Sequence, residues 1–135
     1  MNAPLIVPPD HSLPPAGNTS NWGSLLGASL ALAAAEFASR EPRPVLLLAD
    51  DPRHADQLEA EVRFFGGPDL PVAHFVEWET LPWDTFSPHQ DIISQRLRVI
   101  AGLSRLRRGI VIAAATVLQQ RLPPVDYVAA RSLSL

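Results

Sequence analysis

The stretch that decides the fold is Val45-Leu46-Leu47-Leu48-Ala49-Asp50-Asp51-Pro52. Its first five residues are continuously apolar. This pattern predicts a strand buried on both faces, as in a parallel sheet, because a strand with one wet face alternates polar and apolar side chains. Asp50 or Asp51 can cap a following helix, and proline suits the first position of a helix. The eight residues therefore predict a strand that leads directly into a helix.

The same alternation of helix and strand continues on both sides of this stretch. We expect a helix over 21–40, capped by Thr19 or Ser20, and a second helix that starts at Pro52 and ends at Gly66-Gly67. Further strands are expected at 72–76, 110–114 and 132–135, and further helices at 91–106 and 116–122. Strands that alternate with helices indicate an α/β fold with a parallel sheet and right-handed crossovers.

The three longer helices carry apolar stripes at helical spacing, which predict their buried faces. The stripes are Leu26, Leu30, Ala33, Ala34 and Phe37 in the first helix, Ala55, Leu58, Val62 and Phe65 in the second, and Ile93, Leu97, Ile100 and Ala101 in the third. Residues 1–19 are rich in proline and show little periodicity, so we expect a flexible arm there. Residues 20–135 are expected to form one α/β domain.

Composition limits the classes of function. The chain has 135 residues, a net charge of −3 and no cysteine, and every Lys or Arg position is arginine. The charge gives no general attraction for nucleic acid, and the lack of cysteine leaves no disulfide framework and no thiolate metal site. No apolar run approaches the roughly 20 residues that span a membrane, and prolines interrupt any signal-peptide pattern at the N-terminus. We expect a soluble, cytoplasmic protein without a membrane partner.

In nucleotide-binding α/β folds, a phosphate-binding loop precedes the first helix, so this position is considered first. It needs the pattern G-x-x-x-x-G-K-[ST], in which backbone amides and the lysine hold the phosphates and the hydroxyl binds Mg²⁺. The nearest candidate runs from Gly23 through Gly27 to Ser29, but leucines fill much of it and no lysine is present. We therefore interpret it as a degenerate site, with no cofactor and no ATP hydrolysis by this chain.

Other catalytic or metal patterns are weak. Asp50 and Asp51 resemble an acidic pair that holds Mg²⁺, but helix capping before Pro52 explains both residues without a metal. The histidines do not share a metal-ligand spacing, and no nucleophile elbow of the type G-x-S-x-G occurs. We therefore predict neither catalytic residues nor a metal site.

The loop from Glu77 to Asp91 is unusually specific for a connection. Its candidate residues are Trp78, Leu81, Pro82, Trp83, Asp84, Phe86, Ser87, Pro88, His89, Gln90 and Asp91. In the structural interpretation, which we favour, the large apolar side chains bury against the sheet and Asp84 caps the turn at Ser87-Pro88. In the functional interpretation, the aromatics form a docking face for a protein or stack on unpaired bases.

Arginines cluster at the end of the third predicted helix, at Arg96, Arg98, Arg105, Arg107 and Arg108. Cations suit the negative end of the helix dipole, which explains the cluster without a ligand. The alternative is a phosphate-binding patch, for which Arg105, Arg107 and Arg108 are the candidate nucleic-acid contacts.

The whole run from Trp78 to Leu97 resembles the N-terminal region of bacterial transcription-repair coupling factors. The resemblance extends over about 25–123 and includes Leu26-Gly27-Ala28, the strand at 44–49 and Gln119-Gln120-Arg121. Trp83 stands where that family pattern leads us to expect tyrosine. The N-terminal part of the family looks like the excision-repair protein UvrB without a working ATP site. The resemblance thus implies a truncated RecA-like fold of the P-loop NTPase type.

The resemblance also implies a role. Such a parent is an ATP-driven DNA translocase that displaces stalled RNA polymerase and recruits UvrA for nucleotide excision repair, with ATP and Mg²⁺ in motor domains far from these residues. This chain would be a non-catalytic scaffold that positions the UvrA-binding domain and contacts other parts of the parent. The loop residues would be a family signature without a catalytic role. Two other hypotheses stay open: a nucleic-acid-binding module that uses the arginines and the aromatic loop, and a nucleotidase.

Overall fold

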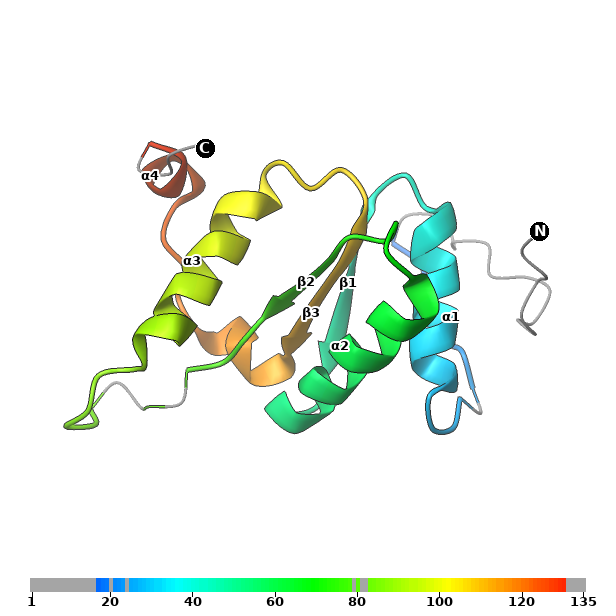
Figure 1. The fold of residues 1–135 in the computed structure, drawn as a ribbon, viewed down its shortest axis with the longest axis horizontal. Coiled ribbons are helices and arrows are strands. Elements are labelled where there is room, and N and C mark those ends of the chain that lie inside the picture. The colour runs from blue at the N-terminus through cyan, green and yellow to red at the C-terminus, as the bar shows by residue number, and fades with distance from the viewer. Residues whose placement is uncertain (1–16, 20, 24, 79, 81–82, 131–135) are drawn as a thin grey trace.

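The computed structural model describes residues 17–19, 21–23, 25–78, 80 and 83–130, and helices and strands alternate along them (Figure 1). In chain order the elements are α1 (Ser29–Arg40), β1 (Pro44–Ala49), α2 (Pro52–Gly66), β2 (Val72–Phe75), α3 (Gln90–Leu103), β3 (Gly109–Ala114), a 3₁₀ helix η1 (Ala115–Gln119) and α4 (Val125–Ala129). The α/β fold predicted from the sequence is confirmed.

The described strands form a parallel sheet in the order β1-β3-β2, so β3 is the central strand. Pro44 aligns with Gly109 and Ala49 with Ala114, while Val72 aligns with Ile110. Helices α1 and α2 lie on one side of the sheet and α3 on the other (Figure 1). All three strands end at the same edge, called here the carboxyl edge.

The core lies between the sheet and the pair α1 and α2. Alanines supply the face of α1, which allows this helix to lie close to its neighbours. The core side chains include Ala31, Ala34, Ala35 and Ala38 of α1, Ala55, Leu58 and Val62 of α2, and Ile110 and Ile112 of β3. Because burial of apolar area is the main favourable term in folding, this layer is the chief source of stability.

Helix α2 follows the sequence prediction closely. Asp51 is its N-cap and accepts a hydrogen bond from the backbone amide of His54 at 2.8 Å, with Pro52 at the first helical position. The helix ends at Gly66, and Gly67 is the C-cap. The predicted stripe is confirmed, with Phe65 at its partly buried margin.

The predicted start of α1 is wrong, because the helix begins at Ser29 and not near residue 21. Gly27 adopts a φ of 57°, a left-handed conformation that interrupts a right-handed helix and that glycine adopts without steric cost. The preceding segment is held by Trp22, whose ring contacts Phe37 edge-on at 5.5 Å. Leu26 is therefore exposed and does not join the core.

The continuous apolar run of β1 does not mean burial on both faces. Val45, Leu47 and Ala49 face the core, but Leu46 and Leu48 are 57% and 43% exposed. They lie on the side of the sheet that carries α3, and α3 contacts β2 at the far edge. The apolar face of β1 is thus uncovered within the described residues.

Helix α3 is also shifted from its prediction. It spans Gln90–Leu103, and Leu97, predicted to face inward, is half exposed. Its most buried residue is Arg96, which the stripe did not include.

The last segments differ as well. The predicted helix at 116–122 is the shorter 3₁₀ helix η1, and α4 was not predicted. The strand predicted at 132–135, the helix cap at Ser20 and most of the arm at 1–19 lie outside the described residues.

Gly109 provides a test of this packing. Its φ is 115°, and a Cβ built on it would lie 2.3 Å from the backbone oxygen of Pro71. We expect Gly109→Ala to lower the free energy of unfolding by at least about 2 kcal/mol, because both the backbone strain and the clash must be relieved. Urea denaturation followed by circular dichroism measures the change.

The control is Gly102→Ala, at a helical position with open space around its Cβ. Alanine favours a helix over glycine by about 1 kcal/mol, so this variant should be as stable as the original or more stable. Equal stability of the two alanine variants would contradict the packing described at Gly109.

Candidate functional site

The candidate site is a groove of about 770 Å³ at the carboxyl edge of the sheet. The loop after β2 supplies one wall, with Trp78, Trp83, Asp84 and Phe86 among its residues. The segment that begins after β3 supplies the other, with Thr116 and Gln119. Parallel α/β sheets bind ligands at this edge because loops from neighbouring strands converge there.

Arg96 of α3 fixes the root of this loop. Its side chain is buried, with only 3% of the residue exposed, and its guanidinium lies between two aromatic rings. The Cζ atom is 4.1 Å from the ring centroid of Phe75 and 4.2 Å from that of Trp78. Cation–π contacts of this kind are worth about 2 kcal/mol when they are desolvated.

Hydrogen bonds complete the surroundings of Arg96. One Nη donates to the backbone oxygen of Val76, and the other donates to Oε1 of Gln120 at 2.8 Å. Burial lowers the pKa of Arg96, and the nearby carboxylate of Glu77 opposes that shift. Glu77 in turn accepts a hydrogen bond from the hydroxyl of Thr116 at 2.8 Å. Three segments distant in sequence are therefore joined at one point.

The loop beyond this root does not bury its aromatics as predicted. Trp78 is partly buried, but Trp83 and Phe86 are each 79% exposed. The favoured interpretation, in which these side chains lock the loop against the sheet, is thus wrong for Trp83 and Phe86. Leu81 and Pro82 lie outside the described residues.

The loop ends at the start of α3. His89 is the N-cap and accepts a hydrogen bond from the amide of Asp91 at 3.3 Å, and Gln90 is the first helical residue. Ser87 is exposed and Pro88 partly buried. The capping role predicted for Asp84 stays a prediction.

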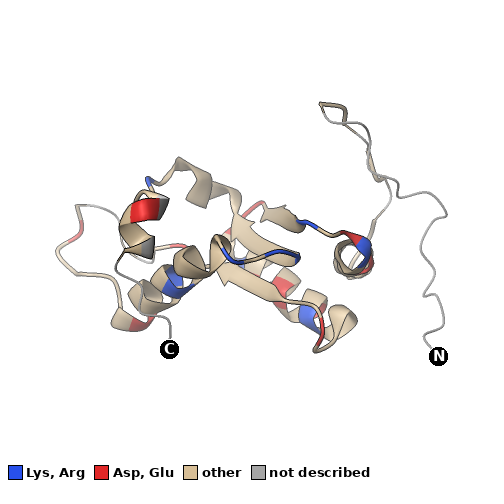
Figure 2. Cartoon of the chain, turned by 90° about the horizontal axis from the view of Figure 1, so that it is seen from above, with Lys and Arg blue, Asp and Glu red and all other residues tan. Residues whose placement is uncertain are grey.

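The arginine cluster lies at the opposite edge of the sheet. Arg105, Arg107 and Arg108 are exposed on the connection from α3 to β3, visible as the blue segment near the viewer in Figure 2. Arg108 donates a hydrogen bond to the backbone oxygen of Asp69 at 3.3 Å. Because β2 runs from that edge to the aromatic loop, the structure does not bring the arginines and the aromatics together.

The degenerate phosphate loop lies at the N-terminus of α1. Gly23 and Gly27 are exposed, and the hydroxyl of Ser29 donates to the backbone oxygen of Leu26 at 2.7 Å. That hydroxyl is engaged within its own turn. The N-cap residue, Ala28, has no side-chain hydrogen bond to the first turn.

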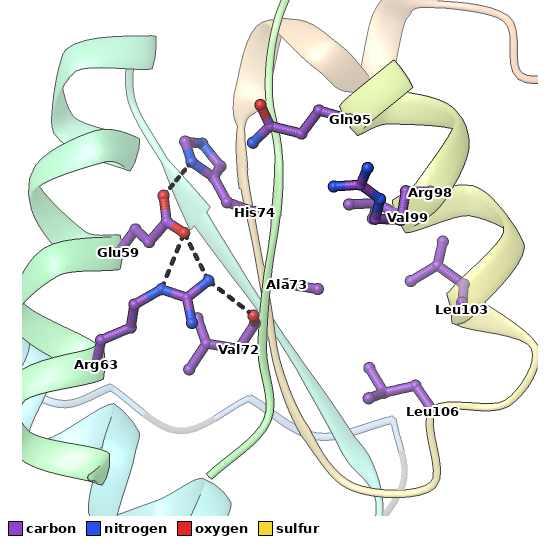
Figure 3. A pocket seen from close by; sticks show the side chains of 11 residues that line it. Glu59, Arg63, Val72, Ala73, His74, Gln95, Arg98, Val99, Leu103 and Leu106 are labelled. Carbon is purple, nitrogen blue, oxygen red and sulfur yellow. Dashed lines mark hydrogen bonds and ion pairs between the residues drawn. The ribbon is translucent and has the colours of Figure 1, made fainter. Parts of the chain in front are cut away.

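A second hollow, of about 310 Å³, lies between α2 and α3 beside β2 (Figure 3). Its polar wall is a network around Glu59. His74, which is buried, places Nδ1 2.7 Å from Oε2 of Glu59, and Arg63 donates to Oε1 through Nε at 3.0 Å and Nη2 at 2.8 Å. Burial raises the pKa of Glu59, but the hydrogen bonds and charges of Arg63 and His74 outweigh burial and hold it below its ordinary value.

Side chains also cross one edge of the sheet. Ile110 donates its amide to the oxygen of Pro71, so the alternate residues Val72, His74 and Val76 direct their carbonyls away from β3. Arg63 donates to the oxygen of Val72 at 3.0 Å, and Arg96 donates to that of Val76. One outward carbonyl of the edge strand and one just past its end thus accept hydrogen bonds from arginines of helices on opposite sides of the sheet.

Sequence reasoning missed Arg96, Glu59 and His74. Arg96 was explained by the helix dipole, and neither Glu59 nor His74 was assigned a role. One signal in the sequence could have indicated the burial of Arg96. Phe75 and Trp78 lie at the end of a predicted strand, and two aromatic rings there can stabilise a buried cation.

The described residues contain no group of three or more histidine, aspartate or glutamate side chains arranged to hold a metal ion. Among them, no helix is both long and apolar enough to cross a membrane.

Comparison with known proteins identifies relatives of one kind. The chain is 41% identical over 118 residues to the transcription-repair-coupling factor of Escherichia coli K12, a match that covers 87% of the chain and 10% of that protein. It is 37% identical over 105 residues to the same factor of Haemophilus influenzae, covering 78% of the chain and 9% of the relative. The chain thus spans about a tenth of the length of these relatives. No protein-family model matches it.

The role of Arg96 as an anchor can be tested with Arg96→Met. Methionine fills space but leaves the oxygens of Val76 and Gln120 without these donors, so we expect a loss of about 2–4 kcal/mol in the free energy of unfolding. Arg98→Met, two residues along the same helix and exposed, should change it by less than about 0.5 kcal/mol. Similar losses in the two variants would argue against the anchor.

Glu59→Gln tests the pH dependence of the second network. Because the folded-state pKa of Glu59 is depressed, its charge contributes stability above the unfolded value of about 4.3, and this contribution is lost as the pH falls through the folded-state pKa. We expect the variant to be less stable by about 1–2 kcal/mol at pH 7 and equal to the original in strong acid. Denaturation across pH 2–7 measures this, with Glu61→Gln on the same helix as control. A difference independent of pH would contradict the assignment.

Proposed function

The chain is homologous to a segment of transcription-repair-coupling factors, and from that premise we propose that it is a non-catalytic scaffold within such a factor. In this proposal it positions the UvrA-binding module of the parent. The parent, a cytoplasmic protein, uses ATP and Mg²⁺ in other domains to move on DNA and displace stalled RNA polymerase. The observation that carries the proposal is the 41% identity over 87% of the chain.

The N-terminus of α1 supports the absence of nucleotide chemistry. A working phosphate loop needs a lysine to neutralise the phosphates and a hydroxyl for Mg²⁺. The chain has no lysine, and the hydroxyl of Ser29 is already bonded to Leu26. A nucleotidase would therefore lack its main electrostatic group.

The face of β1 that the described residues leave uncovered supports a role as one part of a larger body. Leu46 and Leu48 expose adjacent apolar side chains on a sheet face, which is typical of a surface that contacts another protein part. In the proposal, this face packs against the rest of the parent polypeptide. Such a contact would fix the orientation of the neighbouring module.

The alternative of a nucleic-acid-binding module has less support. It requires the arginine cluster and the aromatic loop to act together, but they lie at opposite edges of the sheet. Each feature alone gives a weaker site. The aromatic loop alone lacks the phosphate contacts that supply most of the affinity, and the arginines alone lack base stacking.

The proposal is tested by calorimetry and by capture of UvrA. Titration of the chain with ATP and Mg²⁺ should give no binding heat, and an ATPase with an intact phosphate loop serves as the positive control. Immobilised chain should capture UvrA only when it is joined to the segment that follows it in the parent. Binding of ATP, or capture of UvrA by the chain alone, would refute the scaffold proposal.

A further inference from the structure

The hollow between α2 and α3 combines an apolar wall with charged side chains (Figure 3). Its apolar residues come from β2, from α3 and from the turn after α3, and they are Val72, Ala73, Val99, Leu103 and Leu106. Gly102 lies among them, and a Cβ built on it meets no atom of the described residues within 4 Å. Leu103 is 39% exposed, so a partner can reach this apolar wall from solvent.

The charged side chains of the hollow leave one cation without a partner. Glu59 is engaged through both oxygens, because Oε1 accepts from Arg63 and Oε2 lies 2.7 Å from Nδ1 of His74. Arg98 extends from α3 over the hollow and makes no hydrogen bond or ion pair with a described residue (Figure 3). The eleven residues of the lining are all described, and Glu59 carries their one carboxylate. Asp56, 3.7 Å from Nδ1 of His74, lies outside this lining.

The open shape of the hollow favours a segment of a protein over a small molecule. Sites for small molecules enclose most of the surface of their ligand. Here Arg63, Arg98, Gly102 and Leu103 are exposed, so a ligand in the hollow would keep one side in solvent. A protein segment can bury that side against its own chain.

We infer that this hollow binds an acidic segment of a partner protein. In the complex, a leucine side chain of the partner fills the space beside Gly102, and a neighbouring glutamate or aspartate accepts hydrogen bonds from Arg98. The flat guanidinium presents donors that match both oxygens of a carboxylate, and such charge-assisted hydrogen bonds are stronger than neutral ones. Burial of the leucine against Leu103 and its apolar neighbours adds to the affinity. This inference does not depend on the scaffold role.

The composition of the lining argues against nucleic acid as the occupant. Proteins that bind single strands stack bases on aromatic side chains along a positively charged groove. The lining contains no phenylalanine, tyrosine or tryptophan, and of its two arginines Arg63 is paired with Glu59. A strand would therefore gain one phosphate contact, at Arg98, and no stacked base.

The test uses the 135-residue chain and a capped five-residue peptide that begins and ends with leucine and alternates leucine with glutamate. Nuclear magnetic resonance follows the backbone amide of Gly102 and the methyl groups of Leu103 during the titration. We expect saturable shifts of these signals, and binding weaker by about five- to tenfold when glutamine, which has a similar shape but no charge, replaces glutamate. A thymidine oligonucleotide of five residues should leave both signals unchanged.

Arg98→Met tests the charged contact. It removes the charge but keeps a long apolar side chain, so it should weaken binding of the glutamate peptide by about five- to tenfold and leave binding of the glutamine peptide unchanged. The matched control is Arg107→Met, because Arg107 is an exposed arginine on the connection from α3 to β3, outside the lining. This control should change the affinity by less than about twofold, since an exposed charge without a direct contact is screened.

Gly102→Leu tests the apolar space. The new side chain would occupy the position of the partner's leucine, and leucine favours a helix over glycine, so the variant should fold and bind the peptide at least about tenfold more weakly. Ser94→Leu adds the same side chain at an exposed position of α3 outside the lining, and should bind as the original does. The amide spectrum of each variant shows whether its fold is intact.

Five results would overturn the inference. They are equal affinity for the glutamate and glutamine peptides, a loss in Arg107→Met as large as that in Arg98→Met, unchanged binding by Gly102→Leu, no peptide binding at millimolar concentration, and a shift of the Gly102 amide by the oligonucleotide. The last result would assign the hollow to nucleic acid.

Discussion

The buried guanidinium of Arg96 is the interaction on which the rest of the carboxyl edge depends. A cation cannot leave water without strong compensation, and here two aromatic rings, a backbone oxygen and an amide oxygen supply it. These partners belong to β2, to the loop after it and to the segment after β3. The hydrogen bonds and cation–π contacts that the buried Arg96 side chain requires therefore fix the relative positions of these three parts of the chain. The groove exists because that arrangement is fixed.

The sequence predicts what depends on neighbours along the chain. Helix α2 is the clearest case, since Asp51, Pro52 and Gly67 mark both of its ends through local hydrogen bonds and backbone geometry. The three described strands were placed within about one residue, because each is a short apolar run between turn residues. The start of α1 was misplaced because the leucines before Gly27 mimic a helical stripe. Only the left-handed backbone of that glycine separates them from the helix.

What depends on tertiary contacts could not be predicted. The run at 45–49 is apolar throughout, but burial of both faces needs a helix on each side, and nothing in those residues tells where α3 lies. The candidate site was predicted in part: the loop was identified, whereas the exposure of Trp83 and Phe86 was not. Arg96 was explained by the helix dipole, and its aromatic partners Phe75 and Trp78 lie about 20 residues away in the sequence. A contact between residues so far apart produces no hydrophobic periodicity that a single sequence would show.

The two arginines that bond the outward carbonyls of Val72 and Val76 have a consequence for self-association. An open sheet grows into a fibril only if each copy offers a receptive strand at both borders, so that every addition creates the next template. In this chain Arg63 bonds the oxygen of Val72 in β2, and Arg96 bonds that of Val76, one residue past the strand end, so a second strand could pair along this border only by displacing both side chains. Two copies joined through β1 would have β2 at both outer borders of the described sheet. Further strand pairing would then cost these hydrogen bonds, which disfavours propagation.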